Sequence, residues 1–337
     1  MKRWTILGLV VIVAIAAITS IVILTAKFEE EQAVHLNIPQ GATSESVRDS
    51  MRTSLGESFG STVYRLWSLA AGNAAKSHGS YLIEPGMSAL TAARRVAGGQ
   101  QTPVRVTIGT GWRTLDDLTK RLSKKIEASP ARIKQAVSAV LANDSTYSSP
   151  EQYTAAFVPD TYEFYWTDSP EYVVNKLLQE RNKFWNSDRL RKAEKLGLTP
   201  VEVTTLASIV EEESNNKDEH PMIARLYMNR LDKGMRLQAD PTVKFATGNF
   251  GLRRITGKHL KTKSPYNTYL NTGLPPGPIR IPQKSTIDAV LNAPQHDYIY
   301  MCAKSDFSGR HDFATTYAQH KRNAKRYVSQ LNKRGIR

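Results

Sequence analysis

The hydrophobic pattern begins with one long apolar stretch that differs from everything after it. Residues 5–26 carry no charged side chain over 22 positions, and about 20 apolar residues are enough to cross a bilayer core as a helix. Lys2 and Arg3 precede this stretch, and basic residues favour the cytoplasmic side of a membrane. A cleaved signal peptide is the alternative, but its apolar core is usually only about 7–15 residues long. We therefore expect residues 1–4 in the cytoplasm, a single-pass transmembrane anchor at 5–26, and the rest of the chain outside the inner membrane.

Short alternating runs follow a charged linker at residues 27–34. Residues 36–39 and 104–108 alternate between apolar and polar side chains, which is typical of half-buried strands. Between them, Ser88 opens a helical pattern that ends at a pair of glycines, a common helix stop. The pattern predicts a small α+β module over residues 35–108.

Helical spacing dominates after this module. Leu115, Leu118 and Leu122 recur every three or four residues, as on one face of an amphipathic helix. An aromatic-rich segment at 157–166 interrupts the helices, and it fits either a core strand or a wall that stacks on sugars. At roughly 150 residues per domain, we expect a second, larger domain of mixed α+β structure over residues 109–337.

One helix in this domain has both a clear start and unusual chemistry at its end. Thr199, Pro200 and Glu202 form the pattern of a capping box with proline in the first turn. The helix then runs into three adjacent acids, Glu211 to Glu213. Residues three, four and seven apart share a helix face, and at those distances before Glu213 stand only large apolar residues. Glu213 is therefore the acid expected to point inward.

A carboxylate placed against apolar walls has a clear chemical consequence. Desolvation disfavours its charged form and raises its pKa, which is how a glycosidase obtains a general acid near neutral pH. The plainer alternative is a partly buried glutamate that is neutralised by Arg225, Arg230 or Arg236. Spacing alone leaves both open.

Charge and composition limit the kinds of binding partner that the chain can have. The chain has 46 basic and 31 acidic residues, a net charge of +15, which favours anionic partners. Outside the membrane these are lipid headgroups and the cell wall, so nucleic acid is the weakest reading, although the basic residues near the C-terminus also fit a merely solvated surface. The single cysteine, Cys302, excludes an internal disulfide framework, and no two-histidine zinc motif occurs. We expect neither a metal nor an organic cofactor.

Loops rich in glycine, proline and polar residues follow the acidic helix. The segments 234–243 and 264–278 carry polar and aromatic side chains, which suit carbohydrate binding, although they also fit ordinary connections between core helices. Asp240 is a second acid that could pair with Glu213, and His311 is a candidate base.

Several motifs in this region resemble those of the MltG (YceG-like) endolytic murein transglycosylases. In chain order they are ASIVEEE at 207–213, NRL at 229–231, GMRLQADPTV at 234–243, YNTY at 266–269 and TGLPPG at 272–277. The resemblance is strongest from about residue 157 onward and extends to the anchor and, more weakly, to the module at 35–108, which would then be LysM-like.

The resemblance implies a specific reaction. The family's catalytic glutamate falls on Glu213, which would cleave the bond between N-acetylmuramic acid and N-acetylglucosamine without water and leave a 1,6-anhydro end. Peptidoglycan glycan strands are the implied substrate, with peptidoglycan synthases as partners and termination of strand elongation as the role. Residues expected to position sugar are Asn229, Gln238, Asp240, Tyr266, Asn267 and Tyr269. A second charge at Glu212 would raise the pKa of Glu213 further.

Two other functions remain open. A hydrolytic muramidase would use Asp240 or another acid to activate water. A non-enzymatic scaffold would bind the cell wall through the small module and recruit synthases through the large domain.

Overall fold

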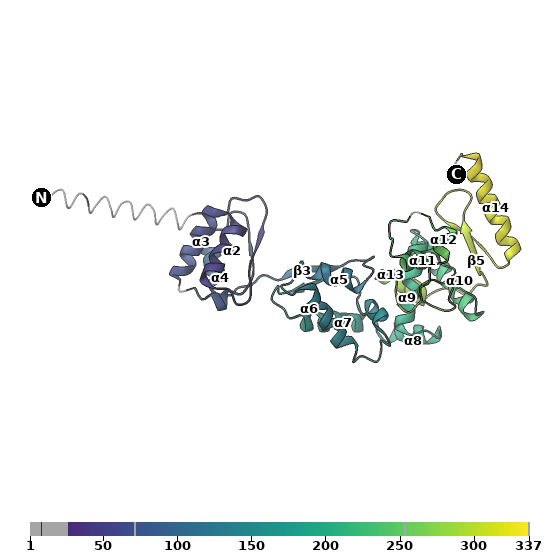
Figure 1. Ribbon diagram of the computed structural model, residues 1–337, viewed down its shortest axis with the longest axis horizontal. Helices are drawn as coiled ribbons and strands as arrows, with labels where there is room; N and C mark the ends of the chain where they lie inside the picture. Colours follow the sequence, from purple (N-terminus) through teal and green to yellow (C-terminus); the bar gives the residue numbers. More distant parts are fainter. Residues whose placement is uncertain (1–7, 9–25, 71, 253, 336–337) are drawn as a thin grey trace. The chain divides into compact units, whose positions relative to one another are not determined.

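The computed structural model describes residue 8 and residues 26–70, 72–252 and 254–335 (Figure 1). The predicted anchor at 5–26 therefore lies almost wholly outside the described residues. Within them, no helix is both long and apolar enough to cross a membrane. The described chain has mixed α+β structure, as the sequence predicts.

The chain divides into two compact units. The first contains the described residues up to Val106 together with two later segments, 123–128 and 163–169, and the second contains the remainder. The hydrophobic pattern does not predict the return of these two segments to the first unit, because the segments are short and distant in sequence.

The first unit has the order strand, helix, helix, strand, helix. β1 (Val34–Ile38) pairs antiparallel with β2 (Gly79–Ile83), with Leu36 opposite Tyr81. Between the strands lie α2 (Ser44–Leu55) and α3 (Glu57–Leu69), and α4 (Ala89–Ala97) follows. α2 and α3 approach closely at Gly60, where a β-carbon would collide with the backbone of Met51. The core includes Trp67 and Tyr81, and the Tyr81 hydroxyl donates a hydrogen bond to the Ser77 carbonyl at 2.9 Å.

The second unit begins within β3 (Val104–Ile108), which pairs with β4 (Asp160–Phe164). α5 (Leu115–Leu122) and α6 (Pro130–Leu141) lie between these strands, and α7 (Pro170–Phe184) follows β4. In the aromatic-rich segment, Phe157, Val158, Tyr162 and Phe164 are buried. This supports the core strand over the sugar-stacking wall.

The helix that carries the acidic motif lies among five further described helices of this unit (Figure 1). Together they are α8 (Ser187–Lys195), α9 (Pro200–Glu213), α10 (His220–Asp232), α11 (Asp240–Thr247), α12 (Gly257–Leu260) and α13 (Lys284–Leu291). α9 is central, and α8, α10, α11 and α13 all contact it. A two-stranded sheet of β5 (Tyr300–Ala303) and β6 (His311–Ala314) supports the last helix, α14 (Tyr317–Lys333).

Candidate active site

α9 begins as its sequence predicts and ends against its own dipole. The Thr199 side chain accepts a hydrogen bond from the Glu202 backbone, and the Glu202 carboxylate accepts one from the Thr199 backbone. Every residue from Val203 to Glu211 is buried. The three acids are the last residues of α9. The helix dipole disfavours negative charge at this end, so each carboxylate needs hydrogen bonds or cations from the surrounding protein to stabilise its charge.

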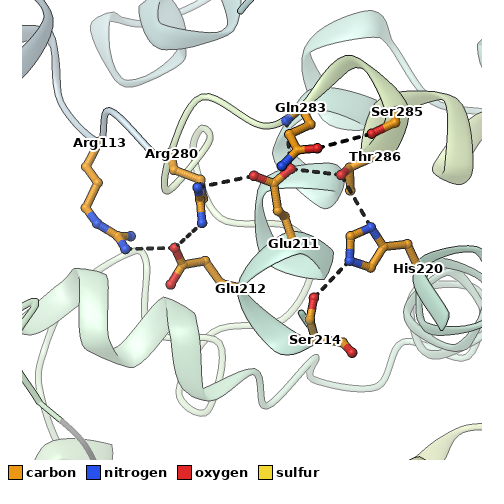
Figure 2. A network of polar contacts seen from close by, with 9 residues as sticks. All are labelled: Arg113, Glu211, Glu212, Ser214, His220, Arg280, Gln283, Ser285 and Thr286. Atoms are coloured by element: carbon orange, nitrogen blue, oxygen red, sulfur yellow. Dashed lines mark hydrogen bonds and ion pairs between the residues drawn. The ribbon is translucent and has the colours of Figure 1, made fainter. Parts of the chain in front are cut away.

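The first two acids are held by two arginines and a loop (Figure 2). The Glu212 carboxylate accepts hydrogen bonds from Arg113 at 2.7 Å and from Arg280 at 2.6 Å. The Glu211 carboxylate accepts them from the Gln283 backbone at 2.7 Å and the Thr286 hydroxyl at 2.8 Å, and Arg280 lies 3.2 Å away. Glu211 is only 8% exposed, so the expectation that Glu213 alone points inward is wrong. α9 is enclosed on all sides, not along one stripe.

The same network fastens the turn after α9. His220, which is 3% exposed, lies with its Nε2 2.9 Å from the Ser214 carbonyl and its Nδ1 3.3 Å from the Thr286 hydroxyl. Figure 2 shows that this series of polar contacts connects α9, α13 and the start of α10. The backbone on both sides of Glu213 is thereby fixed, which limits the positions its carboxyl can take.

Glu213 itself faces a hollow. It lines a cavity of 210 Å³ with Tyr227 of α10, and the Tyr227 hydroxyl donates a hydrogen bond of 2.6 Å to its carboxylate. Burial raises the pKa of Glu213 to about 7, the Tyr227 hydrogen bond opposes this rise, and the charge of Asp240 adds to it. The effect expected of Glu212 has the predicted direction but is smaller than that of Asp240. Near neutral pH a large share of the Glu213 carboxyl is therefore protonated and able to act as an acid.

Asp240 lies beside Glu213 at the start of α11. Its carboxylate accepts a 2.7 Å hydrogen bond from the Tyr269 hydroxyl. Burial raises the pKa of Tyr269, and the hydrogen bond to Asp240 raises it further, so Tyr269 remains a donor. Asp240 is exposed.

Two hollows meet at this pair of acids. Glu213 and Asp240 line both the cavity of 210 Å³ and a second one of 290 Å³, whose wall includes Lys244 and Arg254. A chain of sugars that occupied both hollows would pass across the Glu213 carboxyl, as cleavage within a polymer requires.

The simpler alternative for Glu213, neutralisation by an arginine, finds no support. The Arg230 guanidinium donates to the carbonyls of Ile299 and Leu237, each at 2.7 Å. Arg225 is engaged with Asn229 and Asp232. In the described part of the chain no arginine or lysine lies within ion-pair distance of Glu213, and Arg230 lowers its pKa only through its field.

The residues expected to position sugar divide into two groups. Gln238, Asp240 and Tyr269 line the first hollow. Gln238 has a backbone φ of +52°, an uncommon value outside glycine that tends to occur at functional sites.

The other three expected residues do not line either hollow. The Asn229 amide donates to the carbonyls of His296 and Tyr298, and the Asn267 amide donates to those of Leu260 and Thr262. Tyr266 packs against Phe245 with ring centroids 4.5 Å apart. Their geometry indicates that they hold loops in place.

The sequence identified His311 only as a candidate base, and the structure brings it to the first hollow. The buried Glu219 carboxylate accepts a 2.8 Å hydrogen bond from the His311 backbone and lies 3.1 Å from its Nδ1. The sequence did not identify Tyr227 as a site residue. Nothing in its spacing separates it from other core aromatics of α10. Among the described residues no group of three or more His, Cys, Asp or Glu side chains is arranged to hold a metal ion.

Comparisons with known proteins identify the family of the chain. The model of the YceG-like family matches residues 36–326. A Bacillus subtilis (strain 168) protein named endolytic murein transglycosylase is 36% identical over 177 residues, which cover 52% of this chain and 48% of that protein. One of the same name from Streptococcus pneumoniae serotype 2 is 30% identical over 179 residues, and the match covers 52% of this chain and 32% of that protein. The chain thus spans about half of the first relative and a third of the second.

A solved structure shows that the fold also occurs in another protein. The crystal structure of a YceG-like protein from Listeria monocytogenes matches with a TM-score of 0.58 at 24% identity, over 87% of this chain and 99% of that one.

Proposed function

Because this chain belongs to the YceG-like family, we propose that it is an endolytic lytic transglycosylase of peptidoglycan. The observation that carries the proposal is a single carboxyl, Glu213, with a pKa of about 7 at the junction of two hollows. The bond it cleaves joins N-acetylmuramic acid to N-acetylglucosamine.

The reaction needs one group that first gives a proton and then takes one. Glu213 protonates the glycosidic oxygen, and the bond from that oxygen to C1 of the muramic acid breaks. The ionised Glu213 then removes the proton of the C6 hydroxyl, whose oxygen bonds to C1 and closes the 1,6-anhydro ring. Tyr227, which donates to the Glu213 carboxylate at 2.6 Å, stabilises its ionised form between the two steps.

Asp240 has a separate part in this mechanism. Positive charge develops at C1 as the bond breaks, and a nearby carboxylate stabilises it electrostatically. Since the substrate supplies its own nucleophile, Asp240 does not need to attack C1 or to activate water.

The location of the enzyme at the membrane is proposed from the sequence. The uncharged stretch at 5–26 would anchor the chain in the inner membrane with the catalytic unit on the periplasmic or extracytoplasmic side. Cleavage there would act on nascent strands and end their elongation, close to the synthases that make them. The first unit would be LysM-like and would hold glycan.

Product analysis tests the proposal. Purified peptidoglycan is incubated with the full chain in detergent, beside a Glu213→Gln variant, and the fragments are analysed by mass spectrometry. We expect internal fragments with anhydro ends from the unchanged protein and none from the variant. Reducing ends would instead establish a hydrolase, and the same fragments from both proteins would refute the role of Glu213.

A further inference from the structure

The first unit contains a further hollow, on the face of its sheet that turns away from α2 and α3. Along β1, Leu36 and Ile38 are buried in the core, and alternate side chains of a strand point to opposite faces. His35 and Asn37 therefore lie on the outer face, where they line a hollow of 380 Å³ together with Ser80 of β2. His35 Nδ1 lies 2.9 Å from the Ser80 hydroxyl, so the floor is itself hydrogen-bonded.

The walls of this hollow come from residues 102–105 and from the two segments that return to the first unit. The Glu127 backbone donates to the Trp166 carbonyl at 2.8 Å, which joins the segments to each other. The Glu127 carboxylate lies 2.8 Å from Nε2 of His78 and accepts a hydrogen bond from the Gln40 backbone at 2.7 Å. These contacts tie the walls to the unit and show that the hollow is built into its structure.

The charge that lines the hollow has one sign. Arg105, Lys124 and Lys125 are all exposed along its wall, and none of the described residues that line it carries a carboxylate. Within the described ranges none of the three makes an ion pair. The field of Lys125 acts together with burial to lower the pKa of His35. A concave surface with three unpaired cations concentrates positive potential.

We propose that this hollow binds the carboxylates of an acidic peptide, which in the substrate is the peptide stem that muramic acid carries. This rests on the proposed function. Lysine and arginine bind carboxylates through charge-assisted hydrogen bonds, the Asn37 amide can pair with a peptide backbone, and the Trp166 ring supplies an apolar wall. An uncharged sugar chain would leave all three cations without a partner.

As a consequence, the first unit would select among glycan strands, which the hollows beside Glu213 do not do. A strand that carries free peptide stems offers several carboxylates per muramic acid and is retained by the first unit, whereas a strand stripped of its peptides offers only the lactyl carboxylate and is retained less. The first unit would thus supply preference for peptide-bearing strands, and Glu213 would supply the cleavage.

Calorimetric titration of the full chain in detergent tests this inference. The probes are a synthetic acidic stem pentapeptide, its fully amidated form and a neutral chitin oligosaccharide. The test variant combines Arg105→Gln, Lys124→Gln and Lys125→Gln. The matched control combines Arg65→Gln, Lys76→Gln and Arg94→Gln, which remove the same charge from exposed positions of the same unit.

We expect the acidic peptide to bind, and its affinity to fall by about tenfold in the test variant, since each of the three exposed charge pairs contributes a factor of about 1.4 to 5. The control should bind as the unchanged protein does, and added salt should weaken binding. Equal affinity for the amidated peptide, equal loss in the control, or binding of the chitin oligosaccharide alone would overturn the proposal.

The same titration on Glu213→Gln separates this inference from the proposed function. The substitution lies in the other unit and should leave peptide binding unchanged. For the unchanged protein, absence of anhydro products together with intact peptide binding would refute only the catalytic proposal, and anhydro products without peptide binding would refute only the peptide site.

Discussion

Replacement of Glu213 by glutamine should stabilise the protein while it abolishes cleavage. Glutamine keeps the shape of the side chain and can still accept the Tyr227 hydrogen bond, but it cannot ionise. Burial raises the pKa of Glu213 from its ordinary value of 4.5 to about 7. Since one pKa unit corresponds to about 1.4 kcal/mol, ionising this carboxyl in the folded state costs about 3 kcal/mol more than in the unfolded chain.

The pH range of this effect follows from the two pKa values. Below 4.5 both the folded and the unfolded protein hold the proton, and the carboxyl costs nothing. Between 4.5 and about 7 the unfolded chain has lost a proton that the folded chain retains, so the free energy of unfolding falls as the pH rises. Above about pH 7 the free energy of unfolding has fallen by the full amount. The glutamine variant lacks this term, so its advantage should grow across the interval and then level off.

Denaturant unfolding at a series of pH values measures this difference directly. We expect the variant and the unchanged protein to be nearly equal at about pH 4.5, and the variant to be more stable by about 3 kcal/mol at about pH 8.5. Glu194→Gln, at an exposed position of α8, serves as the matched control and should show no such growth. A difference between Glu213→Gln and the unchanged protein that does not vary with pH would refute the reasoning, and so would a variant that is less stable than the unchanged protein at about pH 8.5.

Four further predictions concern the groups around this carboxyl and its two acidic neighbours. Tyr227→Phe removes a hydrogen bond that lowers the pKa of Glu213, so the alkaline limb of the pH–rate profile should move up by roughly one pH unit; an unmoved limb would contradict the assignment. Asp240→Asn removes a charge that raises this pKa, so the same limb should move down, whatever happens to the maximal rate. Arg280→Ala leaves the buried Glu211 carboxylate and the partly buried Glu212 carboxylate without their shared partner and should lower the free energy of unfolding by about 3–5 kcal/mol. Arg113→Ala removes one of two partners of a single carboxylate and should cost less, which a denaturation curve would show.

Local patterns in the sequence predict local structure well here. Strict alternation marks β3 with the bounds that the structure has, Val104–Ile108, and the capping box at Thr199 marks the start of α9. Both patterns act through neighbours along the chain, so a single sequence contains them completely. The return of residues 123–128 and 163–169 to the first unit depends on contacts that are distant in sequence, such as that between Glu127 and His78, and no local pattern contains it.

The candidate site shows the same limit at the level of single side chains. Helical spacing identifies Glu213 as inward-pointing, but it treats Glu211 as exposed, because it counts only neighbours on α9 and not the loop that donates to Glu211 from Gln283. Asn229 and Asn267 looked like sugar-binding residues since an amide suits a hydroxyl. An amide suits a buried carbonyl equally well, and in the structure both amides bind carbonyls. Only the fold distinguishes these uses.

The row of three glutamates at the end of α9 has a coherent electrostatic explanation. A helix C-terminus disfavours negative charge, and the protein compensates Glu211 and Glu212 with Arg280, Arg113 and the loop before α13 (Figure 2). Had a third cation paired with Glu213, its pKa would fall and it would be a permanent carboxylate, unable to protonate a glycosidic oxygen. The uncompensated position is thus the one that can do acid chemistry, and the deficit in stability above pH 7 is a direct consequence of keeping it so. A substitution that introduced a lysine beside Glu213 should therefore raise stability and lower activity together.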